Sequence, residues 1–332
     1  MKAAWYDRYG DADVVDIRDV ATPEIADDQI LVQVYSSSVT TADWRLRASA
    51  FPRALWLPGR LMFGLFSPRQ HILGGDFAGR VVAVGRTVTR FSKGDSVFGF
   101  ATLGAHAEYI AISEASAVTL MPANLSFDQA AAIPFGGLSA LVFLRDFAKL
   151  KPGQKVLVNG ASGGVGVFAV QVAKALGAEV TGVSSAANLA LVRGLGADHV
   201  IDYAEKDDGG TTAQYDVILD TIGTLDFAGT KRRLTPAGVF VPLNFGLREM
   251  WQSLVTSLRG SRRVLIGVSG DTQPDLIWLR DQLARGGIRP VIDNRYPFVQ
   301  IADAYRRVES RHKTGSVVLT LAAEENGELA AE

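Results

Sequence analysis

The fold of this 332-residue chain is decided by one stretch, Lys155-Val156-Leu157-Val158-Asn159-Gly160-Ala161-Ser162-Gly163-Gly164-Val165-Gly166-Val167-Phe168-Ala169. It begins as an apolar run typical of a buried strand and ends as the start of an apolar helix. Between them, Gly164, Gly166 and Ala169 fit the G-x-G-x-x-G/A pattern of dinucleotide-binding turns. Backbone without side chains can approach a pyrophosphate closely, and the N–H groups at a helix start favour that anion. The alternative is a turn that only packs the helix against the strand.

The predicted contacts with a dinucleotide at this turn come from Gly160, Ala161, Ser162, Gly163, Gly164, Val165 and Gly166. The residues on either side of the turn support this interpretation, because apolar strands alternate there with helices. Ser126 and Gln129 have the spacing of a capping box at a helix start. The later strands are expected at Glu179–Val183, His199–Asp202, Asp216–Asp220, Gly238–Val241 and Arg263–Ile266. Such a pattern predicts a doubly wound parallel sheet, a Rossmann domain that we place at residues 125–270.

The first third of the chain has a different pattern, in which short predicted strands are separated by Gly, Pro and Asp. The strands are expected at Ile30–Val34, Gly79–Gly85, Asp95–Gly99 and Ala107–Ala111. Strands at this spacing indicate a compact β barrel or sandwich, which we place at residues 1–124. Residues 271–332 are expected to complete it. They include a short strand at Pro290–Ile292 and a last strand, Ser316–Thr320, that returns to the first domain. The predicted fold class is α/β.

Charge and composition argue against several classes of function. The net charge is −1, so no overall field attracts nucleic acid or an anionic membrane. With no cysteine, the chain has neither disulfides nor thiolate metal sites. The apolar segment 51–66 is too short to span a bilayer, and the N-terminus has no apolar signal segment. We therefore expect a cytoplasmic protein without nucleic-acid or membrane partners.

The end of the second strand of the parallel sheet indicates which dinucleotide is bound. An NAD enzyme usually has an Asp or Glu there, which holds the ribose 2′-hydroxyl. Here the strand leads into Ser184, Ser185 and Asn188, which can donate hydrogen bonds to a 2′-phosphate without repelling it. No Arg or Lys adjoins them, and two serines are also common turn residues. The prediction is NADPH in preference to NADH.

Several motifs that occur in one order carry a family resemblance. They are Ile72-Leu73-Gly74-Gly75-Asp76-Phe77-Ala78-Gly79, Phe91-Ser92-Lys93-Gly94-Asp95-Ser96-Val97, Ala107-Glu108-Tyr109, the Gly-rich turn, Leu195-Gly196-Ala197-Asp198 and Gly315-Ser316-Val317-Val318-Leu319. Over nearly its whole length the chain resembles the medium-chain dehydrogenases/reductases of the quinone oxidoreductase type. The resemblance implies a GroES-like β-barrel domain, an inserted Rossmann domain, a cleft between them for nicotinamide and substrate, and a homodimer.

The resemblance also implies further cofactor contacts. Tyr203 matches a tyrosine that flanks the 2′-phosphate, and Ser139 matches a threonine near the nicotinamide. Ile222, Asn244 and Phe245 match loop residues that line the cofactor.

The zinc-dependent branch of the same superfamily differs at its metal ligands. That branch needs a Cys and a Gly-His-Glu segment, whereas this chain has Thr40 and Gly74-Gly75-Asp76 at those places. Thiolate and imidazole supply most zinc ligands. The histidines His71, His106, His199 and His312 show no ligand spacing, and each is expected to be a surface or core residue. We therefore predict an enzyme without a metal.

The substrate end of the cleft departs from the family pattern S-V-N-P-x-D. Thr40 replaces the Asn, while Asp43 is kept. Thr40 has a hydroxyl that can polarise a substrate carbonyl, or it is an ordinary strand-end residue; Asp43 is either catalytic or only braces the loop. The longer apolar segment that follows is expected to wall a hydrophobic substrate pocket, with Trp44, Trp56 and Phe63 as lining residues. Core or dimer contacts are its alternative role.

The predicted reaction is hydride transfer from NADPH to the β carbon of an enone or to a quinone ring, with a small hydrophobic substrate and no metal. The cofactor supplies this chemistry while the protein orients the substrate and excludes water. One alternative is a zinc-free carbonyl reductase or alcohol dehydrogenase. An alternative of another class is an NADPH-binding protein without turnover, of a crystallin-like or RNA-binding kind.

Overall fold

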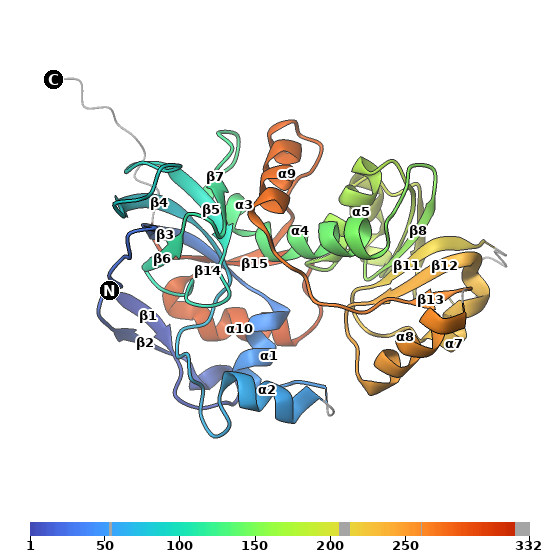
Figure 1. Ribbon diagram of the computed structural model, residues 1–332, viewed down its shortest axis with the longest axis horizontal. Helices are drawn as coiled ribbons and strands as arrows, with labels where there is room; N and C mark the ends of the chain where they lie inside the picture. The colour runs from blue at the N-terminus through green and yellow to red at the C-terminus, as the bar shows by residue number, and fades with distance from the viewer. Residues whose placement is uncertain (53–54, 206–212, 260, 323–332) are drawn as a thin grey trace.

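A computed structural model describes residues 1–52, 55–205, 213–259 and 261–322. The chain is built around two sheets that lie on opposite sides of the molecule, with α4 (Pro134–Leu141) and α9 (Gln273–Ala284) between them (Figure 1). The shared core includes Leu138 of α4, Leu279 of α9 and Phe98 from the N-terminal sheet, all fully buried. The two sheets are therefore joined by one continuous apolar core.

The first sheet is parallel throughout and has the strand order β10-β9-β8-β11-β12-β13. Its strands are β8 (Lys155–Asn159), β9 (Glu179–Ser184), β10 (His199–Asp202), β11 (Tyr215–Asp220), β12 (Leu234–Pro242) and β13 (Arg263–Val264). Its helices are α5 (Gly166–Ala175), α6 (Leu189–Gly194), α7 (Phe227–Thr230) and α8 (Leu247–Arg259). This is the doubly wound order that the sequence predicts, and it reverses between β8 and β11.

The second sheet has the order β14-β15-β3-β4-β5-β7, with β6 also paired to β3. Its strands are β3 (Gln29–Val39), β4 (Asp76–Val84), β5 (Ser96–Phe100), β6 (Tyr109–Ser113), β7 (Ala117–Leu120), β14 (Ile292–Pro297) and β15 (Ser316–Thr320); β1 (Lys2–Trp5) pairs separately with β2 (Asp16–Asp19). The remaining helices are α1 (Thr41–Ala48), α2 (Trp56–Phe63), α3 (Phe127–Ala131) and α10 (Ile301–Glu309). The α/β fold class, with a barrel-like and a parallel sheet, is confirmed.

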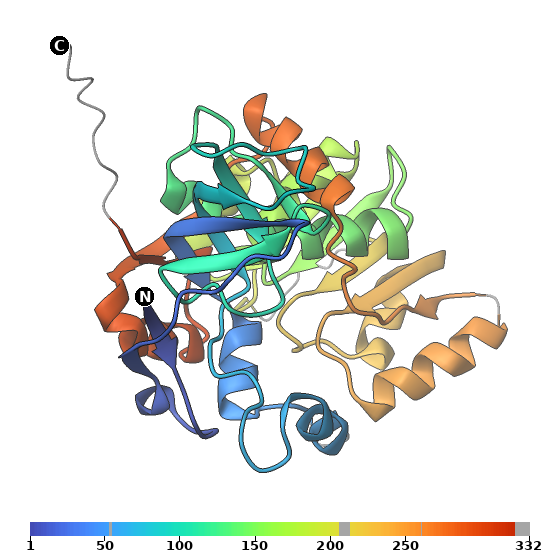
Figure 2. The same cartoon turned by 60° about the vertical axis from the view of Figure 1, so that its left-hand side comes forward.

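The C-terminal segment returns to the N-terminal sheet, as expected, because β15 pairs antiparallel with β3 (Figure 2). Several predicted strands differ in extent: Ile30–Val34 lies within β3, Gly79–Gly85 overlaps the end of β4, and Gly238–Val241 lies within β12. Two further differences have a cause in the pairing of the strands. The strand expected at Pro290–Ile292 begins at Ile292 and runs to Pro297, since its partner β15 supplies backbone hydrogen bonds along that length. The strand expected at Arg263–Ile266 is only Arg263–Val264, because β12 pairs with these two residues alone.

Local capping signals act as predicted at α3. Ser126 accepts a hydrogen bond from the Gln129 N–H, and the Gln129 side chain accepts one from the Ser126 N–H. The helix α2 within the apolar segment was not predicted; it has no buried residue, and Met62 is 67% exposed. None of the described helices is long and apolar enough to cross a membrane.

Candidate active site

The Gly-rich turn joins the carboxyl end of β8 to the start of α5. Gly160 has φ +77°, and a β-carbon there would lie 2.6 Å from the Thr221 hydroxyl. A β-carbon on Gly166 would lie 2.0 Å from the Gly160 carbonyl oxygen. Only glycine fits both places, and the turn is tight enough to aim the first N–H groups of α5 at a ligand. The cradle therefore fits a dinucleotide pyrophosphate.

A group of polar side chains lies beside the turn, where β9 ends. The Ser184 hydroxyl donates to the Ser162 hydroxyl oxygen at 2.7 Å, and the Asn188 amide donates to the same oxygen at 3.3 Å. The Asn188 amide also lies 3.3 Å from the Ser185 hydroxyl. Ser162 therefore accepts from two donors and keeps its own hydrogen as a donor. The structure thus brings these four predicted residues into one hydrogen-bonding surface.

Asp202, the last residue of β10, and Tyr203, which follows it, flank this surface. The Tyr203 N–H donates to the Ser184 carbonyl, and the Tyr203 ring is 68% exposed, so it stands free at the edge of the turn. Asp202 pairs in register with Ser184, and its carboxylate accepts a hydrogen bond from the Ala204 N–H. A carboxylate therefore adjoins Ser184 from the neighbouring strand, a contact that sequence spacing did not indicate.

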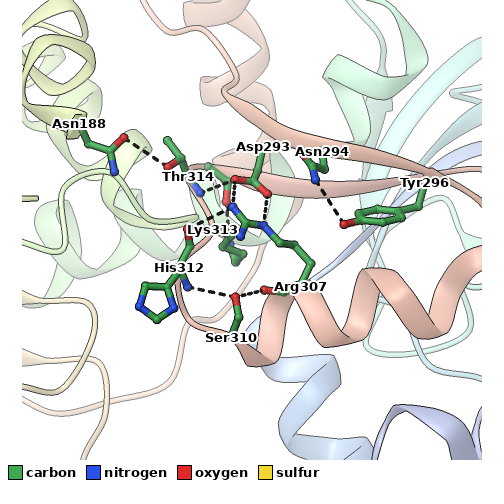
Figure 3. Close-up of polar contacts among 10 residues, drawn as sticks. Asn188, Asp293, Asn294, Tyr296, Arg307, Ser310, His312, Lys313 and Thr314 are labelled. Carbon is green, nitrogen blue, oxygen red and sulfur yellow. Dashed lines mark hydrogen bonds and ion pairs between the residues drawn. The ribbon is translucent and has the colours of Figure 1, made fainter.

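The C-terminal loop, residues 310–315, contacts the Gly-rich turn and, through Thr314, also Asn188 (Figure 3). The Gly315 N–H donates to the Ser162 carbonyl at 2.8 Å, and the Thr314 hydroxyl lies 3.4 Å from the Asn188 carbonyl oxygen. Lys313 lies against Gly164, since a β-carbon on that glycine would be 2.6 Å from its Nζ. Lys313, from a segment distant in the sequence, thus brings a cation to the Gly-rich turn.

An ion pair holds this loop in place. Asp293 of β14 accepts two hydrogen bonds from the Arg307 guanidinium, at 2.7 and 2.8 Å, and one from the Thr314 N–H at 2.8 Å. Burial alone would raise the pKa of Asp293, but these donors hold it below its ordinary value. The carboxylate therefore stays ionised and anchors the loop.

The loop after β11 is organised by Asp220. Its carboxylate accepts hydrogen bonds from the N–H groups of Ile222, Gly223 and Leu225, at 3.2, 2.9 and 2.9 Å. Ile222 is 44% exposed. Asn244 packs against Gly223, since a β-carbon on that glycine would lie 2.9 Å from it, and Phe245 follows, half-buried.

Arg45 of α1 donates to the Asn244 side-chain oxygen. This contact joins helix α1 of the N-terminal region to the loop after β12, and sequence reasoning missed it. The only signal was an arginine one helical turn after Thr41, which is too common a feature to single out.

Ser139 lies on the face of α4 that approaches the Gly-rich turn. It follows Gly136 by one helical turn, and a β-carbon on Gly136 would lie 2.4 Å from the Gly164 carbonyl oxygen.

The structure gives Thr40 and Asp43 a defined local role. Thr40 is the N-cap of α1: its hydroxyl accepts from the Asp43 N–H at 3.2 Å and donates to the Asp43 carboxylate at 2.6 Å. The other Asp43 oxygen accepts from the Gly74 N–H at 3.1 Å. Both residues are buried. This arrangement corresponds to the alternative in which Asp43 only braces the loop. The Thr40 hydroxyl hydrogen is donated to Asp43 and so is already used within the protein.

The three predicted substrate-pocket residues are not brought to one place. Phe63 lines an apolar cavity of about 230 Å³ together with Tyr6, Leu46 and Leu73, and neither Trp44 nor Trp56 is in that lining. Trp44 instead stacks under the Arg311 guanidinium, 5.3 Å from the ring centre. Trp56 is 44% exposed on α2.

The positions that correspond to zinc ligands hold a different network. Asp76 is buried and accepts from the Ser38 hydroxyl at 2.5 Å and the Phe135 N–H at 2.8 Å. Burial raises the pKa of Asp76 well above its ordinary value. His106 is a buried core residue, and burial lowers its pKa. The described ranges contain no group of three or more His, Cys, Asp or Glu side chains arranged to hold a metal.

Comparisons with known proteins agree with this architecture. Residues 26–123 match the alcohol dehydrogenase GroES-like domain family, and residues 195–319 match a family described as zinc-binding dehydrogenase. The chain is 30% identical to a quinone-oxidoreductase homolog of Spinacia oleracea, over 96% of this chain and 98% of that protein. It is 31% identical to an NADPH-dependent alkenal/one oxidoreductase of Arabidopsis thaliana, over 96% and 79%.

Among solved structures, the quinone oxidoreductase of Coxiella burnetii superposes with a TM-score of 0.84 at 28% identity, covering 97% of this chain and 99% of that one. The strand order, the Gly-rich turn and these full-length similarities agree. The chain belongs to the quinone-oxidoreductase-like medium-chain dehydrogenases/reductases, a family of oxidoreductases that use a nicotinamide cofactor.

Proposed function

We propose that this protein is an NADPH-dependent reductase of activated C=C bonds or quinones that works without a metal. The observation that carries the cofactor choice is the hydroxyl and amide surface formed by Ser162, Ser184 and Asn188 beside the Gly-rich turn. These groups suit a phosphate on the adenosine ribose because they can donate hydrogen bonds to it. The relative named as NADPH-dependent alkenal/one oxidoreductase supports the same choice.

When bound, a reduced nicotinamide supplies the hydride. The residues of this chain bind and orient: the start of α5 receives the pyrophosphate, and Tyr203, Ile222, Asn244 and Phe245 flank the dinucleotide. We assign residues 125–270 to the cofactor domain, and residues 1–124 with 271–332 to the domain that completes the substrate site.

Metal independence rests on the sequence. The chain has no cysteine, and it carries Thr40 and Gly75-Asp76 where the zinc branch needs Cys and His-Glu. Activity is expected to survive exhaustive chelation, with less than one zinc per chain by elemental analysis. One tightly held zinc per chain that is needed for turnover would reject this part of the proposal.

A steady-state assay tests the function as a whole. The purified chain is mixed with NADPH or NADH and a panel of quinones, enones and aldehydes. We expect turnover of quinones or enones that is faster with NADPH. Turnover of aldehydes alone would indicate a carbonyl reductase, and tight NADPH binding without turnover of any substrate would indicate a binding protein.

A further inference from the structure

Lys313 is a half-buried cation at the Gly-rich turn that no step so far uses. Its Nζ donates to the Gly315 carbonyl at 2.6 Å, which occupies one of its three donor positions. A β-carbon on Gly164 would lie 2.6 Å from the same Nζ, so the ammonium lies next to the Gly164 backbone. The ammonium is therefore at the turn that the proposed pyrophosphate would contact, and Figure 3 shows Lys313 in its loop between His312 and Thr314.

The other charged groups around this loop are engaged elsewhere. Arg307 pairs with Asp293, and Arg311 lies over the Trp44 ring. Asp293, in turn, is bound by Arg307 and by the Thr314 N–H, so Lys313 has no hydrogen bond to it in the described contacts. The pKa of Lys313 is lowered to about 8, mainly by burial and also by Arg307. The carboxylates of Asp293 and Asp76 raise it and only partly offset these effects.

An anion next to the Gly164 backbone would complete this arrangement, because it would pair with a cation that is already desolvated and positioned. We propose that Lys313 is the cation that pairs with the pyrophosphate of the bound dinucleotide. The assignment rests on the proposed dinucleotide-dependent function. This contact is distinct from one with the 2′-phosphate. We place the 2′-phosphate at Ser184 and Asn188, and it is Thr314, not Lys313, that contacts Asn188.

The test compares three variants of the full chain. Lys313→Met removes the charge and keeps the length, Lys313→Arg keeps the charge, and Lys151→Met is a matched control at an exposed lysine. Dissociation constants for NADH and NADPH are measured by fluorescence titration at pH 7.5. We expect Lys313→Met to weaken both dinucleotides equally, by about 10- to 100-fold, the range for hydrogen bonds to charged groups. Lys313→Arg should restore most of the affinity, and Lys151→Met should change nothing.

A pH series provides a second, independent measurement. A bound pyrophosphate raises the pKa of Lys313, because an adjacent negative charge favours the ammonium. NADH binding by the unmodified protein is therefore expected to take up a proton above about pH 8, where free Lys313 is largely neutral, and to weaken as the pH rises further. NADH has no phosphate monoester of its own that titrates in this range. Lys313→Met and Lys313→Arg should both lose the proton uptake.

The outcomes separate the two proposals. If the unmodified chain binds both dinucleotides and Lys313→Met leaves the affinities and the pH profile unchanged, the pyrophosphate assignment is wrong. A loss confined to NADPH would also overturn it, because it would place Lys313 at the 2′-phosphate. If the unmodified chain binds neither dinucleotide at any pH, the proposed function fails and this assignment fails with it. Circular dichroism of each variant distinguishes lost binding from lost folding.

Discussion

Ser184 is buried at the end of β9, and its hydroxyl donates a hydrogen bond to Ser162. Asp202 already places one carboxylate on the neighbouring strand, in register with Ser184. A second carboxylate at position 184 would add negative charge where the proposed 2′-phosphate lies. The identity of this one side chain is therefore expected to set the cofactor preference.

Ser184→Asp should weaken NADPH by at least about tenfold relative to NADH, since each 1.4 kcal/mol of repulsion changes the affinity tenfold. Ser184→Ala is the matched control, because it removes the hydroxyl without adding charge and should shift the preference much less. Titration of both dinucleotides into each variant measures the ratio. Tighter binding of NADH than of NADPH by the unmodified protein would contradict the proposed preference.

Thr40 is a second single residue with a defined effect, because its side chain caps the start of α1. Thr40→Val removes both cap hydrogen bonds of the hydroxyl and is expected to lower the free energy of unfolding by about 0.5–2 kcal/mol. Thr40→Ser keeps the hydroxyl and should preserve stability. Thermal unfolding and kcat are measured on both variants. A fall in kcat of Thr40→Val that exceeds the loss of folded protein would instead assign Thr40 the polarising role predicted from the sequence.

At the scale of elements, the position of the C-terminal loop depends on β14 and α10. Asp293 of β14 holds Arg307 of α10 and the Thr314 backbone together, and its side chain is only 6% exposed. The loop carries Lys313 and contacts Asn188 and Ser162. Packing of two elements outside the parallel sheet thus positions a loop beside the Gly-rich turn.

Asp293→Asn is expected to cost about 1.5–3 kcal/mol of stability at pH 7, because a charge-assisted hydrogen-bond pair is lost. The lowered pKa of Asp293 means that the pair contributes at neutral pH and is lost on acidification. The difference from the unmodified protein should therefore narrow below about pH 4. Asp303→Asn, at an exposed pair with Arg306, is the control and should cost less than about 1 kcal/mol. Equal effects of the two substitutions in urea unfolding would rule out the anchoring role.

At the scale of the whole molecule, the edge of the parallel sheet carries an exposed apolar stripe. The stripe lies on α8, and its members Leu247, Trp251, Leu254 and Leu258 are 65, 67, 56 and 80% exposed. In the described part of the chain, the neighbouring strand β13 pairs only with β12, so its outer edge is open. An open edge beside apolar side chains favours association with a second copy of the chain.

We expect a homodimer that uses this stripe. Replacing both Trp251 and Leu254 with Glu should shift the mass in light scattering from two chains to one, because charges in an apolar interface are strongly unfavourable. Val299→Glu, at an exposed apolar residue outside the stripe, should leave the mass unchanged. A monomeric unmodified protein at micromolar concentration would refute the dimer.

Some of these features could be predicted from the sequence because their causes are local. The Ser126–Gln129 capping box, the buried strand β8 and the glycines at 160 and 166 each depend on residues within a few positions of one another. Hydrogen bonds and steric contacts at that range follow the covalent order of the chain. For the same reason, the α/β alternation and the return of β15 were predictable, whereas the ends of β13 and β14 were not. Those ends depend on how far a partner strand extends.

The fold class, the family resemblance and the Gly-rich turn follow from the sequence, since each is encoded in short-range spacing. Which distant side chains meet depends on tertiary packing. Lys313 reaches Gly164, Arg45 reaches Asn244 and Asp202 aligns with Ser184. No local pattern specifies these pairs, because they result from the packing of whole sheets and helices against a shared core. In the same way, the sequence alone does not show that the Thr40 hydroxyl is engaged. In the structure it caps α1, and its partner Asp43 also accepts a hydrogen bond from the Gly74 N–H.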